Sequence, residues 1–342
     1  MRGLKGDQQV MIDIDAIEAV ARVMKEFNVG SYVDTFTDPK YYPSPSDDPE
    51  NVVRYFIFMV AIDHRLSRPG RAFEGFIDGE FYHGADALYR LGMIKYNEDP
   101  DFFSPLNMSK ITVDDVRKWL SLRGVNGKVI EVWDADVRTA LLRDLGIKLL
   151  RLHEGKVLNL INKANSRIKQ GNGGLVNLLK VFKAYEDPVE KKAYLLIKFI
   201  ARRGLFKYKD PENEEVPVDN HLSRIAIRLG IIKLPSDLLS KVKAGQEFTY
   251  EEDVRLRLMV RRAFKEVSIR SGISPLILDD FLWMFGRKCC KRDRPSCTVG
   301  CNLECRRFGW CGNGGCLFEG VCEAHKRSEY LPEHSYLNTW YY

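Results

Sequence analysis

Residues 186–230 read EDPVEKKAYLLIKFIARRGLFKYKDPENEEVPVDNHLSRIAIRLG, two segments with helical hydrophobic period separated by a charged spacer. The first segment opens with Asp187, Pro188 and Glu190, which suit the N-cap, the first helical position and the third position of a capping box. It closes at Gly204, a residue type common at helix ends. The pattern predicts an amphipathic helix, and the rest of the chain is interpreted around it.

One lysine of this helix is predicted to lie at the edge of the apolar face. Lys192 precedes three apolar residues by three, four and seven positions, so helical spacing places its amine above them. Partial desolvation there favours the neutral, nucleophilic form of the amine. The neighbouring Lys191 shares a stripe with Lys198 and Arg202, which predicts a solvated basic face.

The second segment is predicted to be a short helix with Asp219 at its N-cap and Gly230 at its end. Taken singly, Asp219 is explained as a helix cap, and Lys192 as a surface lysine whose stem covers apolar neighbours. Taken together in this local pattern, the amine and the carboxylate indicate a catalytic pair.

The pattern K-(apolar helix)-spacer-P-V-D-x-H-x-x-R-x-x-x-R-L-G resembles the catalytic core of the helix-hairpin-helix DNA glycosylases. The archaeal GO glycosylases, which remove 8-oxoguanine, are similar in two segments: their E-x-K matches Glu190–Lys192 and their P-V-D matches Pro217–Asp219. The glycine-rich hairpin of the wider superfamily is replaced here by DPVEKK. The resemblance implies that Lys192 attacks the anomeric carbon of a flipped-out nucleotide with the help of Asp219. The Schiff base so formed can go on to β-elimination.

A second resemblance covers more of the chain. The segments NVVRYFIF at 51–58 and GEFYHGADALYRL at 79–91, with the closing Tyr341-Tyr342, are similar to the queuosine salvage proteins, nucleoside N-glycosidases related to the same fold. This resemblance implies hydrolysis of a 7-deazaguanine nucleoside such as queuosine, with Asp219 in the same role and Lys192 binding substrate. A third hypothesis is a catalytically inactive nucleic-acid-binding protein of the same fold.

The segment ISPLILDDFLWMFGRK at 273–288 resembles the closing helix of both families. The match implies that Asp279 hydrogen-bonds the substrate base and that Trp283 lies near its face; without it, Trp283 would be assigned to core packing. Nucleic-acid backbone contacts are predicted for five residues on polar helix stripes: His221, Arg224, Arg228, Arg261 and Arg262.

Two basic segments have a second explanation as ordinary solvated surface. A helix near 250–272 is predicted to show Arg257 and Lys265 on the same outer face as Arg261 and Arg262. The turn DHRLSRPGR at 63–71 is equally well explained as a phosphate contact or as a solvated loop.

All eight cysteines lie within 289–322. Thiolates in a compact loop rich in Lys and Arg suit an iron–sulfur cluster, because cationic neighbours and backbone amides offset the charge on sulfur. Endonuclease III-type glycosylases carry a [4Fe-4S] loop at this location with the pattern C-x6-C-x2-C-x5-C. The resemblance implies a 4Fe-4S cluster on Cys290, Cys297, Cys305 and Cys311, with Cys301 able to replace one. Zinc or disulfides remain alternatives, as do four ligands combined with one or two disulfides.

Frequent helical patterns and few strand signals predict a mostly α fold, with two helical lobes of glycosylase type and a C-terminal Cys-rich loop. Capping patterns start helices at Asp48 and at Thr112. Further helices are predicted near 133–150, 156–169, 236–244 and 250–272. The expected divisions are an N-terminal helical lobe at 1–110, a lobe with the Lys/Asp core at 111–234, returning helices at 235–288, the Cys-rich loop at 289–324 and a tail at 325–342.

Composition narrows the class of protein. The 342 residues, 45% hydrophobic and 29% charged, suit a soluble globular protein of one or two domains. The longest apolar run, 55–62, is far shorter than the ~20 residues a membrane span needs, and residues 1–9 contain no apolar signal region, which predicts a cytoplasmic protein. A net charge of +6 and a pI near 8.8 favour a polyanionic partner. The resemblance to DNA glycosylases implies that this partner is DNA, and we expect a monomer. Few glutamines among many Lys, Arg and Glu residues indicate a thermophile.

Overall fold

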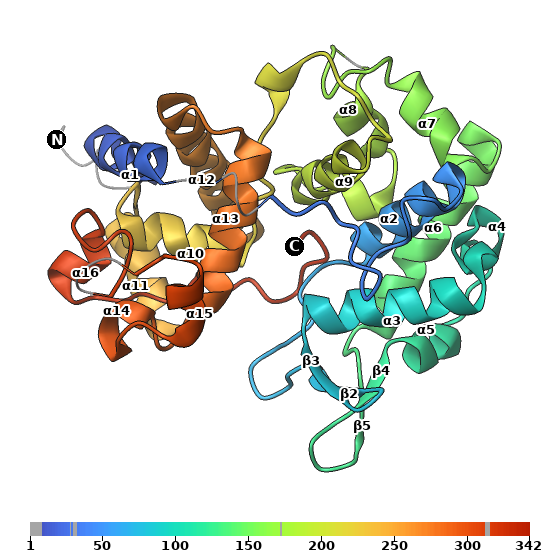
Figure 1. The fold of residues 1–342 in the computed structure, drawn as a ribbon, viewed down its shortest axis with the longest axis horizontal. Helices are drawn as coiled ribbons and strands as arrows, with labels where there is room; N and C mark the ends of the chain where they lie inside the picture. Colours follow the sequence, from blue (N-terminus) through green and yellow to red (C-terminus); the bar gives the residue numbers. More distant parts are fainter. Residues whose placement is uncertain (1–8, 28, 30–32, 172, 312–314) are drawn as a thin grey trace, which may run out of the picture. The chain divides into compact units, whose positions relative to one another are not determined.

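The computed structural model describes residues 9–27, 29, 33–171, 173–311 and 315–342. The chain forms two compact units (Figure 1), each discontinuous in sequence. Unit 1 comprises Met1–Asp34 and Glu214–Leu337, and unit 2 comprises Thr35–Asn213 and Asn338–Tyr342. This division differs from the predicted one, because position 110 lies inside unit 2 and the predicted 111–234 lobe is divided after Asn213.

The predicted mostly α fold is confirmed: the described residues contain sixteen α-helices and six short strands. Unit 2 is built around α2, whose side chains from Val52 to Ala61 are buried except at Arg54. The neighbouring α9 packs against it. The helices of unit 2 are α2 (Pro49–Ala61), α3 (Ala85–Glu98), α4 (Pro105–Met108), α5 (Val113–Trp119), α6 (Ala135–His153), α7 (Val157–Lys163), α8 (Leu175–Leu179) and α9 (Lys191–Arg202).

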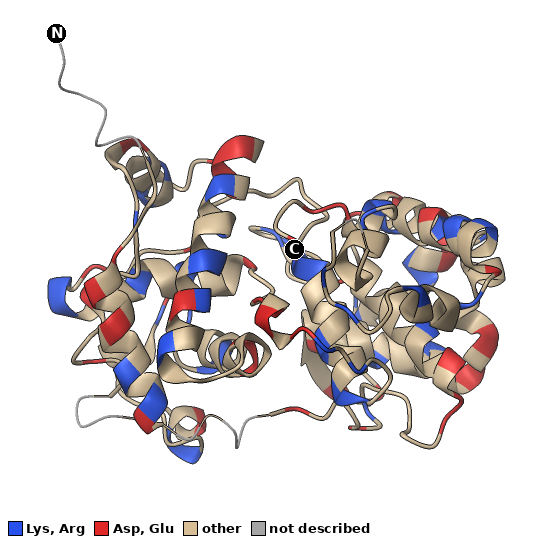
Figure 2. Cartoon of the chain, turned by 90° about the horizontal axis from the view of Figure 1, so that it is seen from above, with Lys and Arg blue, Asp and Glu red and all other residues tan. Residues whose placement is uncertain are grey.

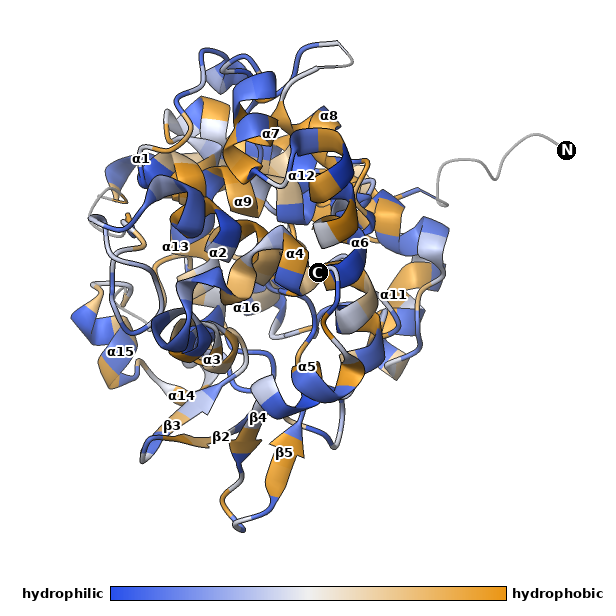
Figure 3. Ribbon diagram, turned by 90° about the vertical axis from the view of Figure 1, so that its right-hand side faces the viewer, coloured by the Kyte–Doolittle hydropathy of each residue, from blue (hydrophilic) through white to orange (hydrophobic). Residues whose placement is uncertain are grey.

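A small antiparallel sheet in unit 2 has the order β3-β2-β4-β5. Its strands are β2 (Glu74–Ile77), β3 (Glu80–His83), β4 (Ser121–Arg123) and β5 (Val129–Glu131). Gly75 sits where a Cβ would approach the Arg123 carbonyl to 2.4 Å, so β2 and β4 can pair this closely only with glycine at that position. Strands β2 and β5 carry apolar residues, orange in Figure 3, and Val129 is largely exposed.

Unit 1 contains α10 packed against α12, α13 and α16, and α1 packed along α12. Strands β1 (Met11–Ile12) and β6 (Ile232–Lys233) pair antiparallel, with Met11 opposite Lys233. The helices of unit 1 are α1 (Ile14–Glu26), α10 (Asn220–Leu229), α11 (Ser236–Ala244), α12 (Tyr250–Ser271), α13 (Pro275–Lys288), α14 (Ser296–Val299), α15 (Leu303–Arg307) and α16 (Glu323–Arg327).

Two of the predicted helix starts are confirmed by their caps. Asp48 accepts hydrogen bonds from the backbone amides of Glu50 and Asn51 at the start of α2. Thr112 and Asp115 form the reciprocal capping box at the start of α5. These local side-chain patterns therefore set the helix boundaries as expected.

Lys and Arg residues are scattered among Asp and Glu residues over the ribbon (Figure 2). In the described ranges, no helix combines the length and the apolar composition that crossing a bilayer requires. Residues 1–8, on which the location prediction rested, lie outside the described residues.

Candidate functional site

The segment before α9 does not form the predicted capping box. The Asp187 carboxylate accepts hydrogen bonds from the amides of Val189 (3.0 Å) and Lys191 (3.1 Å), and it thereby caps a turn that precedes the helix. Glu190 adopts a left-handed φ of 62°, and α9 begins only at Lys191. The Glu190 carboxylate instead pairs with Lys169 and Lys180, each at 2.7 Å. Lys192 therefore stands in the first turn of α9.

The Lys192 amine is completely buried within the chain, at 0% exposure. Its Nζ donates to the carbonyl of Ala61 at 2.5 Å and lies 3.3 Å from Nδ1 of His64. Burial, and then the positive charges of Lys191 and Arg138, hold the pKa of Lys192 well below its ordinary value. The sequence predicted partial desolvation of this amine at the edge of an apolar face, whereas the structure shows complete burial.

The basic face predicted beside Lys192 is not solvated. Lys191 is 7% exposed and donates from Nζ to the Asp63 carbonyl at 3.1 Å, and Lys198 is also buried. The prediction was wrong at these two positions because the side of α9 that carries them is covered by other parts of unit 2. The amine of Lys191 is therefore a structural donor to the turn that follows α2.

A chain of polar contacts continues from Lys192 into the core of unit 2. His64 Nε2 lies 2.8 Å from one oxygen of Asp134, and the other oxygen of Asp134 accepts from Nε of Arg138 at 2.8 Å. Arg138 also donates to the Ile62 carbonyl. Burial, followed by the positive charge of Arg138, lowers the pKa of His64 well below its ordinary value, and the pKa of Asp134 is lowered to about 2 by its contacts with His64 and Arg138, which outweigh burial.

Sequence reasoning missed His64, Asp134 and Arg138. The turn at 63–71 was weighed as a phosphate contact or a solvated loop, yet His64 is buried. One local signal was available: Asp134 and Arg138 stand four residues apart at the start of a predicted helix, a spacing that allows an ion pair. Nothing local indicates that His64 joins them from 70 residues away.

Asp134→Asn is expected to lower the free energy of unfolding by about 3–5 kcal/mol at pH 7, because it leaves the buried Arg138 without its counter-charge. Because the folded pKa of Asp134 is depressed to about 2, its contribution is present above pH ~4 and is lost as the pH falls toward 2. Urea denaturation followed by circular dichroism measures both effects. The matched control is Asp114→Asn, which removes an exposed helix pair with Arg117 and should change little. Equal losses in the two variants would contradict the account.

Asp219 is the N-cap of α10, as predicted from sequence. Its carboxylate accepts from the Leu222 amide at 3.0 Å, and its side chain is 8% exposed. Asp219 belongs to unit 1, whereas Lys192 belongs to unit 2. Each is fixed within its own unit by contacts that the structure describes.

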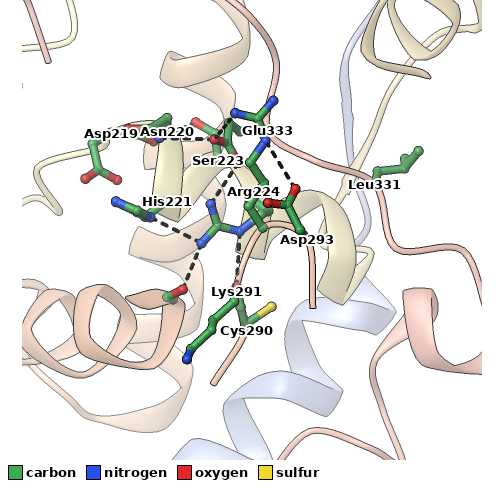
Figure 4. A network of polar contacts seen from close by, with 12 residues as sticks. Asp219, Asn220, His221, Ser223, Arg224, Cys290, Lys291, Asp293, Leu331 and Glu333 are labelled. Carbon is green, nitrogen blue, oxygen red and sulfur yellow. Dashed lines mark hydrogen bonds and ion pairs between the residues drawn. The ribbon is translucent and has the colours of Figure 1, made fainter. Parts of the chain in front are cut away.

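Arg224 is buried in unit 1, where it binds the C-terminal part of the chain (Figure 4). Its guanidinium donates to the carbonyls of Cys290 (3.1 Å) and Gly286 (2.9 Å) and pairs with Glu333 at 2.8 Å. It also lies 3.2 Å from Nδ1 of His221, a half-buried side chain whose pKa burial lowers to about 4, so that His221 is neutral near pH 7. These contacts give Arg224 a structural role in place of the predicted phosphate contact.

Arg228 has the same kind of environment. Its guanidinium donates to the carbonyls of Leu331 (2.7 Å), Lys291 (2.7 Å) and Arg292 (2.6 Å), and the side chain is 2% exposed. Arg228 was predicted to contact the nucleic-acid backbone, but its hydrogen bonds instead hold the C-terminal segment to α10.

The outer face predicted for α12 is only partly present. Arg257 is fully buried and pairs with Asp253 at 3.1 Å, and His334 holds the other oxygen of that carboxylate, so the prediction that Arg257 faces outward was wrong. Arg261 is half-buried and Arg262 is exposed. These two keep a position from which a polyanion can be contacted.

Asp279 and Trp283 stand one turn apart on α13. The Asp279 side chain is buried, and Trp283 is partly exposed. The Arg287 guanidinium lies over the Trp283 ring, 4.4 Å from its centre.

The cysteine segment combines two disulfides with four free thiols. Cys289 is bonded to Cys305, and Cys301 to Cys311. The predicted ligands Cys305 and Cys311, and the substitute Cys301, are therefore excluded as thiolates in this structure. The free thiols are those of Cys290, Cys297, Cys316 and Cys322.

The four free thiols line one small cavity in unit 1. Apolar side chains of Ile225, Leu229, Phe285 and Phe318 complete much of its wall, and Arg228 Nη1 lies 3.4 Å from the Cys290 sulfur. The spacing Cys316-x5-Cys322 repeats that of Cys305-x5-Cys311, so the predicted C-x6-C…C-x5-C frame is still present with a different second pair.

The cavity is not a preformed site for a single ion. In the described ranges, no group of three or more His, Cys, Asp or Glu side chains is arranged to hold a metal ion. Burial, and then the neighbouring thiols, raise the pKa of Cys322 to about 11, and burial raises the pKa of Cys297 and Cys316 as well. These thiols are therefore protonated near pH 7, and any metal that binds them must displace protons.

No protein-family model matches the chain, and no curated protein matches it. Among solved structures, the chain is similar to an 8-oxoguanine DNA glycosylase, Pa-AGOG from Pyrobaculum aerophilum, in complex with 8-oxoguanosine. The two are 13% identical with a TM-score of 0.45, over 89% of this chain and 99% of that one. A TM-score this low gives no information about the activity of this chain.

Proposed function

We propose that this protein is an N-glycosidase that removes a damaged base, such as 8-oxoguanine, from DNA, with Lys192 as its nucleophile. The observation that supports this most is the state of the Lys192 amine, which is buried, hydrogen-bonded to uncharged acceptors and held at a lowered pKa. An ordinary lysine, with a pKa of ~10.4, is protonated near pH 7 and cannot attack carbon. The E-x-K and P-V-D segments place this lysine and Asp219 in a pattern that resembles glycosylases.

The reaction we propose begins with flipping of the nucleotide, which costs a few kcal/mol of stacking. Nζ of Lys192 then bonds to C1′ while the C1′–N bond breaks and its electron pair leaves with the base. Asp219 stabilises the positive charge that develops on the sugar. Because Lys192 has no exposed surface, we propose that DNA binding opens the side chains that cover it.

Substrate contacts in this proposal come from unit 1. Asp279 hydrogen-bonds the base and Trp283 lies against its face. Arg261 and Arg262 contact phosphates, which adds a sequence-independent attraction that weakens with salt. His221, Arg224 and Arg228 have no part in it, because their contacts hold α10 to the C-terminal segment.

We further propose that the four free thiols hold a [4Fe-4S] cluster with a structural role. The donor set fits: four cysteines surround one cavity with apolar walls, and a buried arginine touches one sulfur. A zinc ion would need all of its sulfur ligands about 2.3 Å from one point, and it remains the alternative to the cluster. A cluster instead takes each thiolate on a different iron, so its ligands surround a larger volume.

One observation favours hydrolysis of a 7-deazaguanine nucleoside as the second candidate. The terminal residues that carry the queuosine-salvage resemblance belong to unit 2, and Tyr342 is buried there with its carbonyl accepting from the Arg65 amide at 3.0 Å. Arg65 follows His64 directly, so this tail lies at the turn that contacts Lys192.

The proposal is tested by incubating the protein with 8-oxoguanine or abasic-site DNA under borohydride, and in parallel with queuosine. The proposal expects a covalent DNA adduct and no release of queuine. Queuine release without an adduct would establish the second candidate instead. Duplex binding with neither product would favour the third hypothesis, a catalytically inactive nucleic-acid-binding protein.

Asp219→Asn is expected to reduce base release by about 10²–10⁴-fold, because the carboxylate is lost from the reaction. Asparagine caps helices as well as aspartate does, so the fold should be retained. A single-turnover assay on 8-oxoguanine DNA measures the effect. Asp48→Asn is the matched control, since it makes the same change at the N-cap of α2. Wild-type release by Asp219→Asn would remove the carboxylate from the mechanism.

A further inference from the structure

We propose that His64 takes the proton that Lys192 loses when it attacks, and that Asp134 and Arg138 are positioning residues for His64. The inference rests on the proposed role of Lys192 as nucleophile. It adds a proton acceptor from a different part of the chain, which neither resemblance supplies.

The contacts of His64 determine which ring nitrogen carries hydrogen. Asp134 is an ionised carboxylate that accepts from Arg138 through one oxygen, and it lies 2.8 Å from His64 Nε2 through the other. An ionised carboxylate can only accept, so Nε2 must be the protonated nitrogen. In the neutral ring, Nδ1 then presents a lone pair toward the Lys192 amine, 3.3 Å away.

The contacts of Lys192 match those of a neutral amine. Among the described residues, Nζ has two hydrogen-bond acceptors, the Ala61 carbonyl and His64 Nδ1. A neutral amine has two N–H groups and one lone pair, so both hydrogens are used and the lone pair points away from both acceptors. An ammonium would have a third N–H without an acceptor there. The lone pair therefore takes part in neither hydrogen bond.

The charged groups around this pair come from three segments of unit 2. Asp187 lies in the turn before α9, and Lys191 is the first residue of α9. Asp63 lies in the turn after α2. Asp134 and Arg138 lie at the start of α6. Asp63 accepts from the Tyr89 hydroxyl at 3.1 Å. Its carbonyl and that of Ile62 hold Lys191 and Arg138, so this turn fixes His64 from both sides.

The proton can move along the existing hydrogen bond. When Nζ bonds to C1′ and the base leaves with its electron pair, Nζ becomes cationic and passes a proton to Nδ1 of His64. The imidazolium that forms keeps its Nε2–H on the Asp134 carboxylate. When the sugar ring opens, the C1′–O4′ bond breaks, O4′ takes the proton back from Nδ1, and Nζ forms the Schiff base. His64 is neutral again at the end.

His64→Asn tests the transfer, because asparagine keeps an acceptor near the position of Nδ1 but cannot take a proton. We expect the single-turnover trapping rate at pH 7 to fall about 10²–10⁴-fold. Solvent hydroxide must then take the proton, so the rate of the variant should climb between pH 7 and 9 while that of the wild type stays flat. His83→Asn, at an exposed histidine, is the matched control. An unchanged rate and pH profile in His64→Asn would overturn the inference.

A readout without activity separates this inference from the proposed function. The chain has six histidines, so ¹⁵N spectra of the labelled imidazoles can be assigned by difference with His64→Asn. We expect His64 to be neutral and protonated at Nε2 at pH 7, with its Nδ1 signal shifted in Lys192→Met. An Nδ1–H tautomer or an imidazolium would overturn the inference even if DNA adducts form. The expected tautomer without any adduct from the wild type would instead overturn the proposed function, and this proton step with it.

Discussion

Lys192→Gln is expected to reduce the borohydride-trapped adduct with 8-oxoguanine DNA by at least about 10³-fold, because the amide nitrogen of glutamine has no available lone pair. The fold should persist, since the glutamine amide can still donate to the Ala61 carbonyl that now accepts from Nζ. Release of free base should fall in parallel, because the same bond to C1′ drives departure of the base. Gel analysis of trapped DNA and chromatography of released base measure the two quantities.

Lys191→Gln is the matched control for this result. Lys191 adjoins Lys192, is buried like it, and donates to the Asp63 carbonyl, two residues beyond the Ala61 carbonyl that Lys192 uses. Its charge lowers the pKa of Lys192 less than burial does, and the proposal gives it no bond to the substrate. We expect its adduct yield to stay within about threefold of wild type. Equal loss in the two variants would show that any change at this end of α9 disturbs the site, and the assignment of Lys192 as the nucleophile would then fail.

Cys316→Ala and Cys322→Ala are each expected to lower the iron content of anaerobically purified protein by at least about tenfold. Loss of hydrogen-bonding partners around a metal ligand already costs 10–100-fold in affinity, and loss of the ligand itself should cost no less. Cys290→Ala and Cys297→Ala should behave alike, because all four sulfurs line the same cavity. Metal analysis and the visible absorbance of the cluster measure this.

The disulfide-bonded cysteines provide the control for the cluster. Replacement of Cys301 and Cys311 together by alanine removes one disulfide and no free thiol, so iron should be retained. Iron lost from this double variant but kept in Cys316→Ala would restore Cys311 as a ligand and contradict the assignment. Equimolar zinc with no iron in the wild type would replace the cluster by a zinc site.

Local sequence patterns predicted the fold where a cap decides a helix start. Asp48 and Thr112 start their helices as expected, and α11 begins and ends at the predicted residues. The same reasoning failed before α9, because Asp187 caps a turn outside the helix. Glu190 is drawn into ion pairs with Lys169 and Lys180, partners that no local pattern reveals.

The candidate site was predictable only in its local part. Helical spacing identified Lys192 and the Asp219 cap. For Arg224 and Arg228 it predicted only that both lie on the polar face of their helix. Backbone from residues 286–333, distant in sequence, covers the two arginines. Their burial and their hydrogen-bond partners could therefore not be predicted from local spacing. The same limit applies to His64, which reaches Lys192 across 128 positions.

Cysteine spacing could not select the proposed ligands, because the chain contains the x5 spacing twice, at Cys305-Cys311 and at Cys316-Cys322. Only the disulfide partners Cys289 and Cys301 decide which pair stays free. Those pairings depend on how the loop folds, not on the distance between cysteines along the chain.

The central claim is that a bond forms between Nζ of Lys192 and C1′ of the damaged nucleotide. The most direct measurement is mass spectrometry of the borohydride-trapped complex after nuclease and protease digestion. The account predicts one modified peptide, with the reduced sugar on Lys192. A sugar attached to Lys191, to another lysine or to the N-terminal amine would contradict it, as would base release from the wild type with no trapped sugar on any residue.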